Sequence, residues 1–206
     1  MKKTSGLKSL FFLVMIMTFS SMLLTFVSET TKKTRENHAQ IELAKKIWIA
    51  ANLKNVPSEK ELLDFFSKGK ITESKEFKII DFREHSFSAV VFSGPGLWDH
   101  IYTVICIQPG LTEKGFFSEK LLGLQILQQR ETPGLGGRIE EKEFTNQFSF
   151  FPLKKGSPNI VIGRVKESEL EIDGITGATM TCNFLQESLI KSLVSLKKKY
   201  PVGEIK

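Results

Sequence analysis

Residues 173–181 read DGITGATMT and pass directly into an amphipathic segment that runs to about Lys199. Apolar residues in that segment recur at helical spacing and form one stripe, made of Leu185, Leu189, Leu193 and Leu196. Such a stripe stabilises a helix only when it packs against another element. We therefore predict a closing helix over residues 181–199 that covers a larger hydrophobic core.

The preceding part of the chain supplies strands for that core. Segments rich in β-branched and aromatic residues are separated by Gly and Pro turns. The predicted strands are 77–82, 86–92, 101–107, 121–127 and 159–165. The predicted helices before the closing one are 38–53, 59–67 and a short one over 139–148. These elements indicate an α+β fold, in which a mostly antiparallel sheet is packed with helices.

The amino-terminal segment is apolar enough to cross a membrane. Residues 9–28 carry no charge, and twenty helical residues span a hydrocarbon core of about 30 Å. Lysines precede this segment, as they do in a cleaved secretory signal, but the segment is longer than a usual signal and ends near the bulky Phe26. We predict an uncleaved anchor, with residues 1–8 in the cytoplasm, 9–28 as a transmembrane helix, 29–37 as a linker and 38–206 as one extracytoplasmic domain.

The composition excludes several classes of site. The two cysteines, Cys106 and Cys182, form no C-x-x-C pair, which excludes a disulfide scaffold and a cysteine-ligated metal cluster. We expect Cys106 to be a buried thiol and neither cysteine to be redox-active. The three histidines lack ligand spacing, so we expect no metal site. Half of the formal net charge of +6 comes from Lys2, Lys3 and Lys8, and the remaining +3 is spread along the chain. The dense lysine run, 197–199, has no interleaved aromatic residue, so we expect no nucleic-acid binding.

The loop before the closing helix has two interpretations. In the simpler one, Thr179 or Thr181 caps the helix by accepting a hydrogen bond from an amide of the first turn. In the other, the first-turn amides and the helix dipole favour an anion, and a hydroxyl at that end carries a phosphoester. Gly177 and Ala178 leave room for close approach in either case.

Two further loops are also rich in glycine. Residues 131–138 read ETPGLGGR, which predicts either a loop with positive φ angles or a bare backbone that lies against a flat ring. Residues 94–98 read GPGLW and place Trp98 just after a turn. That side chain is either an ordinary core or rim aromatic or a stacking surface for a planar cofactor.

The chain order of an anchor, then G-x-G-L-W, E-T-P-G-L-G-G and D-G-I-T-G-A-T resembles the FMN-binding domain of RnfG and NqrC. These are membrane subunits of the Rnf and sodium-translocating NADH:quinone oxidoreductase complexes. The most specific part of the resemblance is D-x-x-[ST]-G-A-T, which matches Asp173–Thr179, and residues 131–136 reinforce it. The total length is closer to RnfG, whereas Gly96-Leu97-Trp98 is closer to NqrC, and we favour RnfG.

The resemblance implies that FMN is joined through its phosphate to the hydroxyl of Thr179 by a separate ApbE-type flavin transferase. The other residues that it assigns to FMN binding are Asp173, Thr176, Gly177, Ala178, Thr181, Glu131, Thr132, Gly134, Leu135, Gly136 and Trp98. By analogy, Trp98 and the glycine loop 134–137 line the isoalloxazine.

The resemblance also implies a role as an electron-carrier subunit without catalytic activity of its own. Its complex would be of the Rnf type (ferredoxin:NAD) or of the NQR type (NADH:quinone), in the bacterial inner membrane, with the FMN-binding domain, residues 38–206, on the periplasmic side. Partners would be the other subunits, membrane lipid and the transferase. Two alternatives stay open: a non-covalent flavin-binding or assembly domain, and a regulator or enzyme that carries T-G-A-T only as a helix cap.

Overall fold

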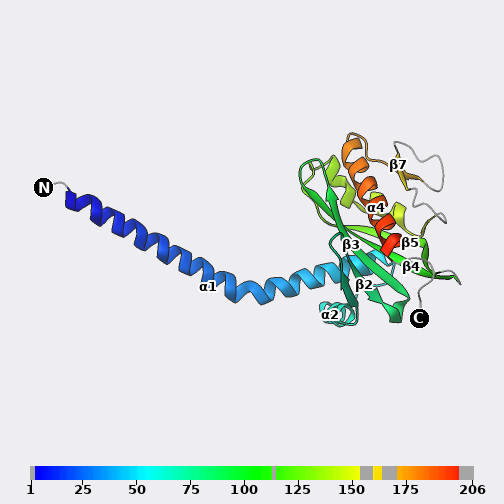
Figure 1. The fold of residues 1–206 in the computed structure, drawn as a ribbon, viewed down its shortest axis with the longest axis horizontal. Helices are drawn as coiled ribbons and strands as arrows, with labels where there is room; N and C mark the ends of the chain where they lie inside the picture. Colours follow the sequence, from blue (N-terminus) through cyan, green and yellow to red (C-terminus); the bar gives the residue numbers. More distant parts are fainter. Residues whose placement is uncertain (1–2, 113–114, 154–159, 164–170, 200–206) are drawn as a thin grey trace. The chain divides into compact units, whose positions relative to one another are not determined.

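The computed structural model describes residues 3–112, 115–153, 160–163 and 171–199 (Figure 1). The chain divides into an amino-terminal unit, residues 1–42, and a compact unit, residues 43–206. The first helix, α1 (Lys3–Ala50), begins in the former and ends in the latter.

Helix α1 continues through the segment where we expected a linker. Residues 29–37 contain neither Gly nor Pro and are rich in Lys, Arg, Glu and Thr, so nothing in them stops a helix. The Thr30 and Thr31 hydroxyls donate to the Val27 carbonyl at 3.0 and 2.8 Å, as they would in a continuous helix. The prediction that a separate helix begins at residue 38 is therefore wrong. The helix ends at Ala50, before Asn52, which has a φ of +53°.

By its length and composition, α1 could cross a membrane, and no other helix in the described ranges meets the same criteria. Its apolar side chains between Leu10 and Val27 are exposed.

The compact unit is built on one antiparallel sheet, as predicted. Its strands lie in sequence order, namely β1 (Lys70–Glu73), β2 (Phe77–Phe82), β3 (Phe87–Pro95), β4 (His100–Thr112), β5 (Gly115–Gln128) and β6 (Phe151–Pro152). A separate parallel pair joins β7 (Val161–Gly163) to β8 (Glu171–Asp173). Strands β1, β6 and β8 were not predicted, because four residues or fewer give too short a pattern. Part of the predicted strand 159–165 lies outside the described residues.

One predicted helix is broken into short turns. Instead of a helix over 139–148, the chain forms η2 (Gly136–Glu140), α3 (Lys142–Thr145) and η3 (Asn146–Phe148). Glu141 is the reason, because its extended backbone (φ −64°, ψ +144°) interrupts the helical path. Ile139, Phe144 and Phe148 are nevertheless all buried. The prediction of α2 (Glu59–Ser67) is confirmed, and Ser58 with Glu61 forms a capping box at its start. A further short turn, η1 (Arg83–His85), lies between β2 and β3.

The closing helix α4 (Thr179–Lys199) packs against the sheet, and α4 and β3 are in contact (Figure 1). All four leucines of its stripe are buried, in the same cluster as Val90 and Ile105. Each buried leucine stabilises the fold by about 1.5–3 kcal/mol. Gly94 allows this approach, since a Cβ there would lie 1.7 Å from Ser188 Oγ.

The last turns of α1 pack elsewhere on the sheet. Cys106 Sγ of β4 lies 3.5 Å from the Ile47 carbonyl oxygen, and a Cβ at Gly123 of β5 would lie 2.6 Å from the Ala50 oxygen. The sheet is therefore held between helices, and the middle of α4 lies against the end of β3, at Ser188 and Gly94.

Candidate functional site

The three glycine-rich loops meet at one buried carboxylate, that of Glu131. Its Oε1 accepts hydrogen bonds from the backbone N–H groups of Leu97 (2.8 Å) and Trp98 (3.3 Å). Its Oε2 accepts one from the hydroxyl of Thr181, at 2.6 Å. Glu131 is only 4% exposed. Segments up to 84 residues apart in sequence, from Leu97 to Thr181, are thus joined by a single side chain.

Trp98 is not a core residue. Its side chain is 70% exposed, and its indole Nε1–H donates to the hydroxyl of Thr132 at 3.2 Å. This bond joins the loop at 94–98 to the loop at 131–138 at the surface. Leu97, Leu135 and Met180 are also exposed by about half. Trp98 is therefore held in place while most of its ring faces solvent.

The loop at 131–137 forms a tight turn against α4. The Thr132 carbonyl accepts the N–H groups of Leu135 (3.1 Å) and Gly137 (3.0 Å), and Gly134 has the predicted positive φ, +74°. Gly136 is buried, and a Cβ at that position would lie 2.6 Å from Thr181 Oγ1. Only glycine lets the loop come so close to the helix.

The loop before α4 is ordered by residues on both sides. Asp173 ends β8, where its N–H donates to Gln147 Oε1 (2.7 Å) and its carbonyl accepts from Gln147 Nε2 (3.2 Å). The Ala178 N–H donates to the Ile175 carbonyl at 3.0 Å, which closes a turn in which Gly177 has a φ of +81°. No sequence signal pointed to Gln147, because it lies 26 residues before the loop that it supports.

Thr179 is the first residue of α4, and its side chain is exposed. No hydrogen bond of its hydroxyl is found among the residues that the structure describes. The Thr181 hydroxyl donates to Glu131, and no N–H group among the described residues is found to donate to it as it would in a cap. The first backbone hydrogen bond of the helix runs from the Cys182 N–H to the Ala178 carbonyl at 3.0 Å and leaves the earlier N–H groups of the first turn without an intrahelical partner. The hydroxyl at residue 179 is left for another use.

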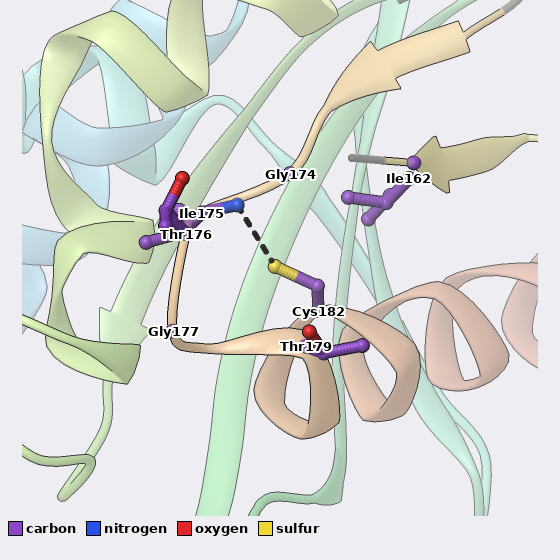
Figure 2. Close-up of a pocket in the computed structure, with 8 residues that line it drawn as sticks. Ile162, Gly174, Ile175, Thr176, Gly177, Thr179 and Cys182 are labelled. Carbon is purple, nitrogen blue, oxygen red and sulfur yellow. Dashed lines mark hydrogen bonds between the residues drawn. The ribbon is translucent and has the colours of Figure 1, made fainter. Parts of the chain in front are cut away.

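A cavity of about 580 Å³ opens beside this hydroxyl (Figure 2). Its lining combines the end of β7, the loop and the first turn of α4: Ile162, Gly163, Gly174, Ile175, Thr176, Gly177, Thr179 and Cys182. The glycines leave its wall as bare backbone. A second hollow of about 490 Å³ shares Gly174, Ile175 and Thr176 and adds Arg138, Gln147 and Asp173.

Cys182 lines the cavity next to Thr179, and its Sγ accepts the Ile175 N–H at 3.5 Å (Figure 2). Burial raises the pKa of the Cys182 thiol, and this hydrogen bond opposes the rise only in part. Burial also raises the pKa of Cys106, which is fully buried as predicted. Both side chains are therefore neutral thiols at pH 7.

Comparison with known families gives this region its identity. Residues 96–194 match the family described as "FMN-binding domain". This part of the chain is an FMN-binding domain. The matched residues contain most of the three loops and most of α4, so the convergence on Glu131 lies within that domain.

Named relatives extend the likeness. This chain is 32% identical to the NqrC protein of the Na(+)-translocating NADH-quinone reductase from Chlamydia caviae, over 50% of this chain and 37% of the relative. The NqrC protein of Pasteurella multocida is 33% identical, over 47% of this chain and 36% of the relative. The chain thus spans less than two-fifths of the length of these curated relatives. They support the FMN-binding family, but give no specific support to our preference for RnfG.

Solved structures share the fold. The crystal structure of NqrC from Parabacteroides distasonis superposes with a TM-score of 0.61 at 20% identity, covering 81% of this chain and 95% of that one. NqrC of Shewanella oneidensis gives 0.58 at 19% identity, covering 79% and 99%. The α+β architecture with a mostly antiparallel sheet is therefore that of known NqrC structures.

The residues that the sequence assigned to FMN fall into two groups. One group is exposed at the surface: Trp98, Thr132, Gly134, Leu135, Asp173, Thr176, Gly177 and Thr179. The other is buried and bonded or packed within the protein: Glu131, Gly136, Ala178 and Thr181. Ile162 and Gly163 were not predicted as cavity residues, since they come from a short strand without a motif.

The cavity suits FMN in size and chemistry. Its volume lies within the range of about 300–1,000 Å³ that is usual for cofactor sites. A phosphate bound at Thr179 would lie at the amino terminus of α4, where unpaired backbone N–H groups and the helix dipole favour an anion. Exposed apolar side chains at Trp98 and Leu135 provide a surface that a planar ring could cover.

Proposed function

We propose that this chain is an electron-carrier subunit that holds FMN covalently, through a phosphoester on Thr179. The observation that carries the proposal is an exposed hydroxyl at the first residue of α4, beside a cavity of cofactor size, within an FMN-binding domain. Bound FMN would supply the electron-transfer chemistry, while the chain supplies position and electrostatics.

Attachment requires an accessible hydroxyl and a place for the phosphate. A phosphoester on Thr179 would keep a negative charge at the positive end of the α4 dipole, which stabilises an anion by about 0.3–1 kcal/mol at an exposed position. Among the described residues, the Thr179 hydroxyl has no hydrogen-bonded base to activate it, which fits attachment by a separate ApbE-type flavin transferase. Asp173, at the entrance to the same loop, is the acidic residue that this enzyme would recognise.

The ring would lie over the exposed side of the site. Trp98, fixed by its bond to Thr132, and Leu135, beside Gly177, offer apolar area at the edge of the loops. Gly134 and the backbone around it present no side chain that would prevent a flat ring from approaching. Thr176 and Gly177 would line the path between the ring and the phosphate.

We further propose that α1 anchors the subunit in the bacterial inner membrane. Residues 9–28 carry no charge, whereas residues 1–8 carry three lysines, a charge pattern that favours a cytoplasmic amino terminus. The FMN-binding domain would then face the periplasm, where a covalent bond prevents loss of the cofactor. The relatives are named as subunits of a sodium-translocating NADH-quinone reductase, so the partners would be the other subunits of an NQR-type complex, or of the related Rnf type.

The test is the intact mass of the full chain after co-expression with an active flavin transferase. We expect an increase equal to FMN minus one water, mapped to the peptide that contains Thr179, and none without the transferase. Thr179→Val removes the attached flavin. Thr72→Val is the matched control, because it removes the hydroxyl of an exposed threonine on β1, outside the site, and leaves the modification intact.

Three other results would contradict the proposal. If Thr179→Val still carries covalent flavin, the attachment residue is wrong. If flavin is bound but released on denaturation, the chain is a non-covalent flavin-binding or assembly domain. If no flavin binds at all while the transferase modifies another substrate, the loop serves only to start a helix.

A further inference from the structure

The Glu131 carboxylate is a buried negative charge with no cation beside it. Among the described residues, no Lys, Arg or His nitrogen lies within 4.0 Å of it, and its neighbour Arg130 pairs with Asp99 at 3.5 Å instead. An isolated buried charge is costly, so such a group needs strong compensation. Three hydrogen bonds supply it here, from the N–H groups of Leu97 and Trp98 and from the Thr181 hydroxyl.

The space around this carboxylate is shaped to hold it. A Cβ at Gly96 would lie 2.6 Å from Oε1, and a Cβ at Gly136 would lie 2.8 Å from Oε2. Any other residue at either position would displace the carboxylate from its donors. Two glycines from two different loops therefore make room for this one carboxylate. A hydrogen-bonded carboxylate at the surface would need no such space in the surrounding backbone.

The three donors lie on the two sides of the proposed flavin site. Leu97 and Trp98 belong to the loop that presents the exposed indole, while Thr181 is two residues after the proposed attachment residue on α4. The amino terminus of α4 also contributes a partial positive charge, which attracts a carboxylate. Glu131 thus connects the ring side of the site to the attachment side without an exposed surface of its own.

We propose that Glu131 is a positioning residue rather than a ligand of FMN, and that its fixed negative charge makes the bound flavin harder to reduce. The second part rests on the proposed function. Reduction adds electrons to the ring, and a nearby fixed anion disfavours that added charge by Coulomb repulsion. Positioning and charge are separable, because an amide of the same shape keeps the first and removes the second.

The experiment compares Glu131→Gln with Glu131→Ala in the full flavinylated chain. The glutamine can still accept from the Leu97 N–H while its NH₂ donates to Thr181 Oγ1, so we expect the intact mass to show wild-type flavin content. We also expect the midpoint potential of the flavin in Glu131→Gln to rise by at least about 30 mV. For a two-electron couple, this corresponds to a tenfold change in the reduced-to-oxidised ratio. Glu140→Gln is the matched control, since it removes the same charge from an exposed position and leaves the potential within that margin.

Glu131→Ala removes the positioning as well. We expect its rate of flavin attachment to fall at least tenfold, with rescue to near the wild-type rate in Glu131→Gln. If Glu131→Gln and Glu140→Gln have equal potentials, the charge has no effect and that part of the inference is wrong. If Glu131→Ala is modified at the wild-type rate, Glu131 does not position the site.

A flavin-free measurement separates this inference from the proposed function. In a Trp48→Phe background, Trp98 is the only tryptophan, and Trp48 Nε1 has no hydrogen bond to lose within the described residues. We expect Glu131→Ala to lower the fluorescence anisotropy of Trp98, and Glu131→Gln to preserve it. If the wild-type chain never takes up flavin, the proposed function fails and the effect on potential fails with it, while the anisotropy still decides whether Glu131 holds the loops.

Discussion

Replacing Thr181 by Val tests whether the Glu131 hydrogen bonds hold the site together. The substitution keeps a β-branched side chain of nearly the same volume in the first turn of α4 and removes only the hydroxyl. Thr181 is 1% exposed, so no water can take over the bond to Glu131. The carboxylate would keep its two backbone donors but lose its shortest contact, the one at 2.6 Å.

The cost follows from the type of bond that is lost. A hydrogen bond to a charged acceptor contributes about 1.5–3 kcal/mol, and a buried group left unsatisfied adds its desolvation penalty. We expect Thr181→Val to lower the free energy of unfolding of the compact unit by about 2 kcal/mol. For a unit of this size, that corresponds to a fall in Tm of about 4–8 °C.

The assay is urea and thermal unfolding of the flavin-free chain, followed by circular dichroism. Thr179→Val is the control, because it is the same chemical change in the same turn at an exposed position, and we expect it to change stability by less than about 0.5 kcal/mol. The double mutant with Glu131→Ala should show a coupling energy of about 1–2 kcal/mol. Equal effects of Thr181→Val and Thr179→Val, or additivity in the double mutant, would refute the reasoning.

Three further predictions test the surroundings of the site. Gly136→Ala places a Cβ 2.6 Å from Thr181 Oγ1 and should cost about 1–3 kcal/mol in unfolding experiments, whereas Gly137→Ala, whose nearest contact would be 3.3 Å, should cost clearly less. Alkylation of Cys182 by iodoacetamide, followed by mass spectrometry, should be slow at pH 7 and should accelerate as the pH rises. Burial raises the pKa of this thiol, and only the thiolate reacts. Cys106, whose pKa burial also raises, should react only after unfolding. Gln147→Ala removes two hydrogen bonds to the backbone of Asp173 and should slow flavin attachment at least several-fold with little change in Tm, while Asn146→Ala, next to it and exposed, should leave the attachment rate unchanged.

The main elements of the fold could be predicted because their signals are local. The leucine stripe of α4 shows a helical periodicity within a few turns. The strands are recognised by β-branched residues within a few positions. Helix α1 differs from the prediction at residues 29–37 because composition alone was misleading there. Their polar composition favours a linker, although no Gly or Pro ends the helix. The prediction for 139–148 is wrong because one extended residue, Glu141, interrupts an otherwise helical composition.

The site could be predicted as a set of loops but not as a geometry. Asp173–Thr179 marks the proposed attachment loop because the residues that start the helix and those that suit a phosphate are adjacent in sequence. The bond from Thr181 to Glu131 joins residues that are 50 positions apart, and the bonds between Gln147 and Asp173 join residues that are 26 apart. No spacing rule covers such pairs, so only the fold shows that Glu131 faces inward while Trp98 faces solvent.

An attachment residue must satisfy two requirements that normally conflict. It must be exposed, so that another enzyme can reach it, and exposed loops are usually the most mobile parts of a domain. It must also be fixed, because the cofactor that it carries has to stay at a constant distance from its redox partners. Thr179 meets both, since its side chain is exposed while the residues on either side of it are tied to the core, Asp173 by Gln147 and Thr181 by Glu131. The contacts that fix the site therefore extend beyond the short motif, and we expect their loss to affect flavin attachment as well as the stability of the fold.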